Sequence, residues 1–268
     1  MWLVLASSAL AFAPRTQIRR VAKLRASSIF EDDKVLGVLG IDYDYPPIDG
    51  DIDGPNTFTF KVIREVVKGL TFERAQAGYI DAGIKEELAR AVKVLEGKGV
   101  VGLTGDCGFM MFYQKVVNDL THLPVFMSSL LQSSLLASSF EEDERVAIFT
   151  ANSTSLEPAI PELLGMCGIR DDKMDQFYVV GCQDIEGFDA VAKGQAVNTT
   201  LVNRGIKTLL AQQLEQNPKT RAALIECTEL PFYGNTFRRD FNLTTFDAVT
   251  LANFFYSSRA VNTNFNDG

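Results

Sequence analysis

Two cysteines stand at matching places, 120 residues apart. Cys107 comes shortly after the apolar run Val100–Leu103, and Cys227 after the apolar run Ala222–Ile225. A short apolar run bounded by turn residues is typical of a buried strand. Ligands of open α/β sheets bind beyond the carboxyl ends of the strands, which is where these thiols are delivered. We therefore expect the two thiols to face each other across one cleft.

The segment around the second cysteine repeats the first over a longer stretch. When Val101–Leu131 is aligned with Arg221–Leu251, six positions are identical, and an acid precedes each cysteine. Two similar lobes related by a pseudo-twofold axis would bring equivalent strand ends to one interface, where pockets are favoured. The identical pairs are Cys107/Cys227, Phe112/Phe232, Tyr113/Tyr233, Leu123/Leu243, Phe126/Phe246 and Leu131/Leu251, and the two acids are Asp106 and Glu226.

Two thiols on opposite sides of a small carboxylate suit proton transfer at the carbon beside that carboxylate. One thiolate would remove a proton, and the other would supply or accept one on the opposite face. We expect turn N–H groups and a helix N-terminus to lower the thiol pKa. A nearby charge on Asp106 would raise it, so that carboxylate is expected to point away or to bind backbone N–H groups. The candidates for holding the substrate are Thr104, Asp106, Gly108, Thr150, Asn152 and Thr228.

Other chemistries are less well supported by the residues present. Cys167 and Cys182 lack the repeated context, and a lone free cysteine is more often part of a core than of a site. His122 is the only histidine, so a metal site with several histidines is excluded, and a solvated or capping role is expected. The acidic loop Asp42–Pro55 lacks the spacing of an EF-hand. We expect neither a metal nor a cofactor.

The elements that must hold these thiols alternate between helix and strand patterns. Ile84–Gly97 carries apolar residues at helical spacing, and the strand Val100–Leu103 follows it almost at once. This alternation is typical of parallel sheets. Further strands are predicted at Val35–Ile41, Val146–Thr150, Phe177–Val180 and Ala222–Ile225, and further helices at Leu156–Met166 and Thr200–Gln216.

The predicted fold is α/β, with two pseudo-symmetric Rossmann-like lobes. Each lobe is expected to be a parallel-sheet αβα sandwich, and the active site is expected between them. The chain of 268 residues is long enough for both lobes to bury a core. We assign residues 29–138 to the first lobe, completed by residues 243–268, and residues 139–242 to the second. The net charge of −8 argues against nucleic acid as a partner.

Residues 1–28 are predicted to be a targeting leader. Residues 2–13 form an apolar run that is too short to span a bilayer and is typical of a signal peptide. The following residues up to 28 are basic and free of acids, as in transit peptides. The join Ala9–Pro14 resembles the phenylalanine-centred motif of algae with secondary plastids. We expect a chloroplast location, with a secreted or endomembrane protein as the alternative, and no membrane association of the mature form.

The paired cysteine motifs resemble those of the aspartate/glutamate racemase superfamily. The motifs are Gly105–Phe109 with Phe126–Gln132, and Glu226–Pro231 with Phe246–Asn253. Two further stretches, Asp42–Asp53 and Gly69–Glu73, are similar to the branch that contains the algal Alma-type dimethylsulfoniopropionate lyases. The resemblance covers nearly all of residues 34–256.

The resemblance implies a cofactor-free two-cysteine site, formed by Cys107 and Cys227, and a homo-oligomer (dimer or tetramer). For a lyase it implies that one thiolate removes the α-proton of a zwitterionic carboxylate. Dimethyl sulfide then leaves, and acrylate remains. Cys107 is favoured as the base because Gly105 and Gly108 permit close backbone approach. The alternatives are a cofactor-independent amino-acid racemase or epimerase, and a non-catalytic relative that binds small carboxylates.

Overall fold

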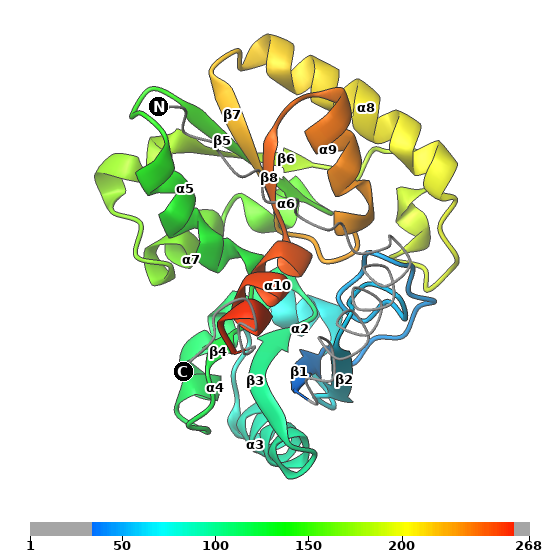
Figure 1. The fold of residues 1–268 in the computed structure, drawn as a ribbon, viewed down its shortest axis with the longest axis vertical. Helices are drawn as coiled ribbons and strands as arrows, with labels where there is room; N and C mark the ends of the chain where they lie inside the picture. Colours follow the sequence, from blue (N-terminus) through cyan, green and yellow to red (C-terminus); the bar gives the residue numbers. More distant parts are fainter. Residues whose placement is uncertain (1–33, 260–268) are drawn as a thin grey trace, which may run out of the picture. The chain divides into compact units, whose positions relative to one another are not determined.

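The computed structural model describes residues 34–259, which contain two parallel four-stranded sheets (Figure 1). The leader predicted for residues 1–28 lies outside the described residues. The predicted α/β class with two parallel-sheet lobes is confirmed. The first sheet has the order β2-β1-β3-β4, from β1 (Val35–Gly40), β2 (Lys61–Val66), β3 (Val100–Gly105) and β4 (Val125–Phe126). The second has the order β6-β5-β7-β8, from β5 (Arg145–Thr150), β6 (Phe177–Gly181), β7 (Thr220–Ile225) and β8 (Thr244–Phe246).

The internal repeat is visible in the strand register. In the first sheet the pairing of β1 with β3 shifts by one residue between Val35 and Leu36. In the second sheet the pairing of β5 with β7 shifts in the same way between Arg145 and Val146. Each sheet therefore carries the same irregularity at the start of its central strands. The two strands that precede the cysteine turns, β3 and β7, occupy equivalent positions in the two sheets.

Two long amphipathic helices cover the sheets. Helix α3 (Ala82–Gly97) begins at Asp81, whose side chain accepts a hydrogen bond from the Ile84 N–H at 2.8 Å. Helix α8 (Thr199–Gln216) begins at Asn198, which caps it in the same way. Figure 1 shows α3 beside β3 and α8 along the second sheet. Both helices were predicted, and each begins one or two residues earlier than expected.

Shorter helices fill the remaining connections. The short α-helices are α2 (Phe72–Gln76), α4 (Gln114–Asn118), α5 (Ser133–Ser139), α6 (Ser153–Leu156), α7 (Ile160–Met166), α9 (Gly234–Asp240) and α10 (Ala248–Arg259). The 3₁₀ helices are η1 (Gly108–Tyr113), η2 (Ser129–Gln132), η3 (Asp171–Gln176), η4 (Phe188–Ala190) and η5 (Pro231–Tyr233). No helix within residues 34–259 is long and apolar enough to cross a membrane.

The predicted helix Leu156–Met166 is wrong at its start. The chain forms α6 and α7 with a break between them, and Pro158 lies in that break. Proline has no N–H to donate and its ring crowds the preceding turn, so it interrupts a helix that begins before it. The edge strand β2 was not predicted, because its half-exposed sequence includes Lys61 and Arg64 and lacks an apolar run.

The last helix packs on the lobe opposite to the strand that precedes it. Strand β8 belongs to the second sheet, whereas α10 contributes Leu251 and Phe255 to a buried cluster with Leu36 and Val38 of β1. The chain therefore crosses between the lobes directly after β8. This crossing ties the ends of the two sheets together. The residue limits of the lobes stay predictions.

Candidate active site

The turns that follow β3 and β7 touch each other. The Thr228 hydroxyl donates a hydrogen bond to the backbone carbonyl of Asp106. Gly108 packs so closely on the Glu226 carboxyl that a Cβ there would lie 1.9 Å from Oε1. Glycine is therefore required at position 108 for the two lobes to approach. Cys107 and Cys227 are brought to one interface, with exposures of 8% and 5%.

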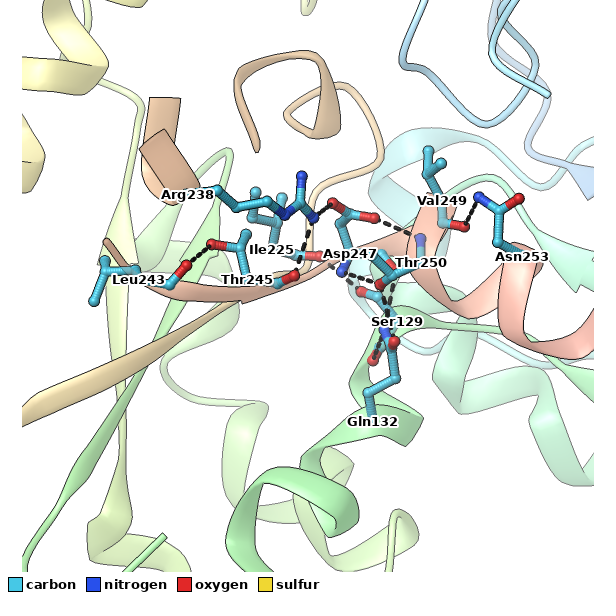
Figure 2. Close-up of polar contacts among 10 residues, drawn as sticks. All are labelled: Ser129, Gln132, Ile225, Arg238, Leu243, Thr245, Asp247, Val249, Thr250 and Asn253. Atoms are coloured by element: carbon cyan, nitrogen blue, oxygen red, sulfur yellow. Dashed lines mark hydrogen bonds and ion pairs between the residues drawn. The ribbon is translucent and has the colours of Figure 1, made fainter. Parts of the chain in front are cut away.

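A network of polar contacts holds the carboxyl end of β7 in place (Figure 2). The Ser129 hydroxyl donates to the Ile225 carbonyl at 2.8 Å, directly before the Glu226–Cys227 turn. Gln132 on the same segment donates to the Asp247 carbonyl at 2.9 Å. The buried Asp247 carboxylate is paired with Arg238 at 2.9 Å. The position of the second cysteine turn is thus set by contacts from η2 and from the start of α10.

The Asp106 carboxylate is bound by a backbone N–H group, which is one of the two arrangements that the sequence analysis expected. Its Oδ1 accepts a hydrogen bond from the Ile41 N–H at 2.9 Å, and its Oδ2 pairs with Arg64 Nε at 2.8 Å. Arg64 lies on β2 and also contacts Asp53 at 3.5 Å. Burial raises the pKa of Asp106 to about 6, and the Arg64 charge opposes that rise. Asp106 therefore anchors the Cys107 turn to β2 and to the loop after β1.

The other candidate substrate-binding residues divide into two groups. The Thr104 hydroxyl donates to the Phe126 carbonyl at 2.9 Å, which is a bond between strands β3 and β4. Thr150 is buried beside Glu226 beneath the second cysteine turn. Asn152 lies on the wall of a large cavity, and its Oδ1 caps helix α6. Of these three side chains, Asn152 is the one placed to meet a ligand.

The second cysteine has a carboxylate partner that the sequence analysis did not select. The Cys227 thiol donates a hydrogen bond to Glu229 Oε2 at 2.8 Å. Glu229 also lines the same cavity, so the thiol is linked to the ligand space through this side chain. The sequence does show an acid two residues after the second cysteine. It was not selected because the comparison of the two motifs favoured shared residues, and the first motif has Phe109 at the equivalent position.

The expected lowering of the thiol pKa is wrong. Burial raises the pKa of both thiols well above the ordinary value, and nearby acids raise it further. Glu226 and Glu229 face Cys107 and Cys227 alike, and Asp106 adds to the effect at Cys107. The backbone N–H of Phe109 favours the Cys107 thiolate but does not outweigh these causes. A raised pKa makes each thiolate a stronger base, which suits removal of a weakly acidic proton.

The two glutamates beside the thiols are themselves perturbed. Burial raises the pKa of Glu226 to about 7 and that of Glu229 to about 8. Glu226 Oε1 is fully buried and has no hydrogen-bond partner among the residues the structure describes. A carboxyl with this pKa changes its charge near neutral pH. Of the two, Glu229 is the one in hydrogen-bond contact with a thiol, that of Cys227.

The cavity that Asn152 and Glu229 line, of about 520 Å³ and lined by described residues, lies between the two lobes. From the first lobe, Tyr43 reaches across it and donates to the Val191 carbonyl, while accepting from the Gly194 N–H at 2.8 Å. This contact closes one end of the cavity. The wall consists of Asp42, Tyr43, Thr71, Phe72, Glu73, Gln76, Ala151, Asn152, Gln183, Phe188, Asp189, Val191, Ala192 and Glu229.

The described residues do not form a ready-made metal site. Within residues 34–259 no group of three or more His, Cys, Asp or Glu side chains is arranged to hold a metal ion. His122 is exposed in the connection after α4 and does not line the cavity, in line with its predicted solvated role. Cys167 and Cys182 are buried in the same two hydrophobic clusters as Cys107 and Cys227, and neither lines the cavity.

Several proteins of similar sequence are named dimethylsulfoniopropionate lyase. Dimethylsulfoniopropionate lyase 7 of Emiliania huxleyi (strain CCMP1516) is 42% identical over 234 residues, which cover 86% of this chain and 68% of the relative. The dimethylsulfoniopropionate lyase of Durusdinium sp. clade D is 38% identical over 221 residues, covering 82% of this chain and 73% of the relative. The chain belongs to the dimethylsulfoniopropionate lyase family. No family model matches it.

Other comparisons set the limits of this likeness. Dimethylsulfoniopropionate lyase 5 of the same Emiliania strain is 43% identical over 233 residues, yet the match covers 46% of that protein. The chain thus spans about half the length of this relative. Among solved structures, the Picrophilus torridus aspartate racemase matches 84% of the chain with a TM-score of 0.52 and 15% identity. Unliganded arylmalonate decarboxylase matches 88% with a TM-score of 0.51 and 15% identity. These two share the fold.

Proposed function

We propose that the protein is a dimethylsulfoniopropionate lyase that releases dimethyl sulfide and acrylate by β-elimination. The family membership supports the reaction class. The observation that supports dimethylsulfoniopropionate as the substrate is the charge of the cavity. Among the described residues that line it there are four acids, Asp42, Glu73, Asp189 and Glu229, and no lysine or arginine.

An acidic cavity with aromatic walls suits a cation. The aromatic residues Tyr43, Phe72 and Phe188 offer π faces, which attract positively charged groups such as a sulfonium. A dicarboxylate such as aspartate would instead need a cationic partner for its second carboxylate. The composition of the cavity therefore favours the lyase over a racemase of acidic amino acids. The Asn152 amide, at the second-lobe wall, is placed to donate to the substrate carboxylate.

Cys227 acts as the base in this proposal, and Glu229 assists it. Cys227 donates to a carboxylate, whereas the described residues offer the Cys107 thiol no comparable acceptor. Because of this contact we propose Cys227 as the base, in place of Cys107, which the sequence analysis favoured. A bound sulfonium lowers the pKa of nearby acids and thiols, because an opposite charge favours their ionised forms. Substrate binding thus promotes formation of the thiolate that attacks the α-proton.

The reaction needs little further help from the protein. The thiolate takes the α-proton, the electron pair of the C–H bond forms the new double bond, and the β-carbon–sulfur bond breaks. The departing sulfonium leaves as neutral dimethyl sulfide, so its departure needs no acid. The second thiol, Cys107, stays protonated in this proposal, because burial and nearby acids raise its pKa.

The test is incubation of the protein with dimethylsulfoniopropionate and gas-phase detection of dimethyl sulfide. We expect sulfide and acrylate in equal amounts, and none above background from Cys227→Ala. A parallel incubation with aspartate or glutamate in heavy water should leave the α-carbon unlabelled. Labelling of an amino acid without sulfide release would favour the racemase. Ligand-dependent thermal stabilisation without turnover of either would favour a non-catalytic relative.

We also propose a secondary-plastid location and a homo-oligomeric state. The composition of residues 1–28 supports the first, and the resemblance to the racemase superfamily supports the second. A fluorescent protein fused behind residues 1–28 should enter the plastid of an alga, and secretion of the fusion would contradict this. Light scattering should give a mass that is a multiple of the mature chain, and a monomeric mass would contradict the second proposal.

A further inference from the structure

The proposed lyase must dispose of a proton in every turnover. Dimethylsulfoniopropionate gives dimethyl sulfide, acrylate and H⁺, so the proton taken by Cys227 does not return to the product. A racemase has no such need, because a proton is given back to the substrate carbon. The inference drawn here rests on the proposed function. It concerns the route by which that proton leaves.

Glu229 is the first acceptor on this route, since it already receives the hydrogen bond of the Cys227 thiol. Its direct way to solvent runs through the large cavity, which substrate and product fill during the reaction. On another side, Glu229 borders a small hollow that it shares with Asp51, Tyr45 and Tyr233. Asp51 is therefore a neighbour of Glu229 outside the large cavity.

Asp51 has the features of a proton acceptor. It is fully buried, and its Oδ2 accepts hydrogen bonds from the Tyr45 hydroxyl at 2.6 Å and from the Ile48 N–H at 2.8 Å. Its Oδ1 has no hydrogen-bond partner within residues 34–259. Gly50, with φ of +107°, lets the loop pack on the backbone of Phe232, where a Cβ would lie 2.7 Å from the Phe232 Cα. This packing holds Asp51 against the second lobe.

We propose that Cys227, Glu229 and Asp51 form a proton relay that carries the α-proton of the substrate to the surface of the loop after β1. The proton moves from the thiol to the Glu229 carboxylate and then to Asp51. It leaves through the acidic loop, where Asp49 is exposed and Asp53 is partly exposed. No bond other than those to the proton changes in these steps.

The charges around Asp51 agree with this role. From its own loop it faces Tyr45, Asp49 and Asp53, and from the second lobe Glu229 and Tyr233. Burial raises the pKa of Asp51 to about 7, close to the value of about 8 at Glu229. A proton therefore passes between the two carboxyls at little cost in free energy, and it leaves Asp51 near neutral pH.

The test compares Asp51→Asn with Asp44→Asn, which makes the same change of charge at an exposed position of the same loop. We expect Asp51→Asn to lower kcat for sulfide release by about 10- to 100-fold while KM changes little. Raising the concentration of a small buffer base such as imidazole should restore kcat in this variant. Wild type and Asp44→Asn should be insensitive to the buffer. An unchanged kcat, or a loss that the buffer does not restore, would overturn the relay.

A second variant keeps the relay testable if Asp51→Asn folds poorly. Tyr45→Phe retains the carboxyl but removes a hydrogen bond that favours its ionised form. The rise of kcat with pH, which requires an ionised Asp51, should then move to higher pH. An unmoved profile would contradict the relay. If wild type releases no sulfide, the proposed function fails with it, whereas an active wild type with inert Asp51 and Tyr45 variants refutes the relay alone.

Discussion

The two cysteine turns share a backbone plan and differ in their charges. Each follows the central strand of a parallel sheet, and the acid before each cysteine donates its N–H to the strand beside it, Asp106 to Leu39 and Glu226 to Phe149. In the first turn the acid is paired with Arg64, whereas in the second Glu226 Oε1 has no partner among the described residues. The second turn alone places a carboxylate on its thiol.

This difference fits a reaction in which a proton moves one way. A racemase works in both directions and profits from two matched bases. A lyase needs one base with an acceptor behind it, and the Cys227–Glu229 pair supplies both. The two turns therefore share their backbone geometry and differ in the charged groups around the thiol.

The largest expected effect is a difference between the two cysteines. Cys227→Ala should reduce kcat/KM for sulfide release by about 10⁴-fold, because it removes the base. Cys107→Ala should cost only about 10-fold, since it removes a hydrogen-bond donor. Steady-state assays of both variants measure the contrast, and circular dichroism controls for folding. A larger loss in Cys107→Ala would reverse the assignment.

The next effect separates the carboxylate from the thiol. Glu229 must be ionised to accept the Cys227 proton, so wild-type kcat/KM should rise with pH towards a plateau near its pKa of about 8. Glu229→Gln should lower the plateau by about 100-fold and move the rise to higher pH. Glu162→Gln, at an exposed position of α7 that does not line the cavity, makes the same change and should leave the profile unchanged. Equal profiles for wild type and Glu229→Gln would remove Glu229 from the mechanism.

The paired acid of the first turn should matter for stability. Arg64→Met leaves the buried Asp106 without its ion pair and should destabilise the fold by about 3 kcal/mol at pH 8. At pH 5 the loss should be smaller, because Asp106, with a pKa of about 6, is then largely protonated. Urea unfolding at the two pH values measures both quantities. A loss that does not depend on pH would mean that Arg64 acts through packing alone.

The unpaired acid of the second turn should give the smallest effect, with the opposite sign. Burial raises the pKa of Glu226 from 4.5 to about 7, so the folded state binds this proton more tightly than the unfolded chain. The stabilisation is complete below pH 4.5 and is lost as the pH rises through 7. Glu226→Gln should therefore flatten the fall of the unfolding free energy between pH 5 and pH 8 by about 2.5 kcal/mol. A steeper fall in the variant would show that the charged carboxylate is favoured in the fold.

The sequence was most informative where a signal is local. The apolar runs before Cys107 and Cys227 predicted the central strands, and the period of Ile84–Gly97 predicted α3. The break at Pro158 was misjudged because proline is tolerated in the first turn of a helix, and the helix was assumed to begin there. The tie of Asp106 to backbone N–H groups was correctly expected from the cost of a nearby charge.

The parts that could not be predicted depend on contacts between distant residues. The partner of Asp106, Arg64, lies 42 residues away on a strand without an apolar pattern. The direction of the thiol pKa follows from burial and from acids of both turns, which no spacing along the chain reveals. Asp51 sits in a loop whose acids the sequence analysis compared only with an EF-hand, and its burial depends on packing against the second lobe.

The central claim is that Cys227 and Glu229 act as one acid–base pair, and the pH dependence of thiol alkylation tests it most directly. Iodoacetamide labelling of Cys107 and Cys227, resolved by peptide mass spectrometry, gives a pH midpoint for each thiol. The pH midpoints are compared, and not the absolute alkylation rates, because burial slows the alkylation of both thiols. The account predicts that Glu229→Gln lowers the midpoint at Cys227, because the carboxylate that accepts the thiol hydrogen bond and raises the thiol pKa is gone, and that it lowers the Cys107 midpoint by less. A Cys227 midpoint that does not move in Glu229→Gln, or a larger shift at Cys107, would contradict it.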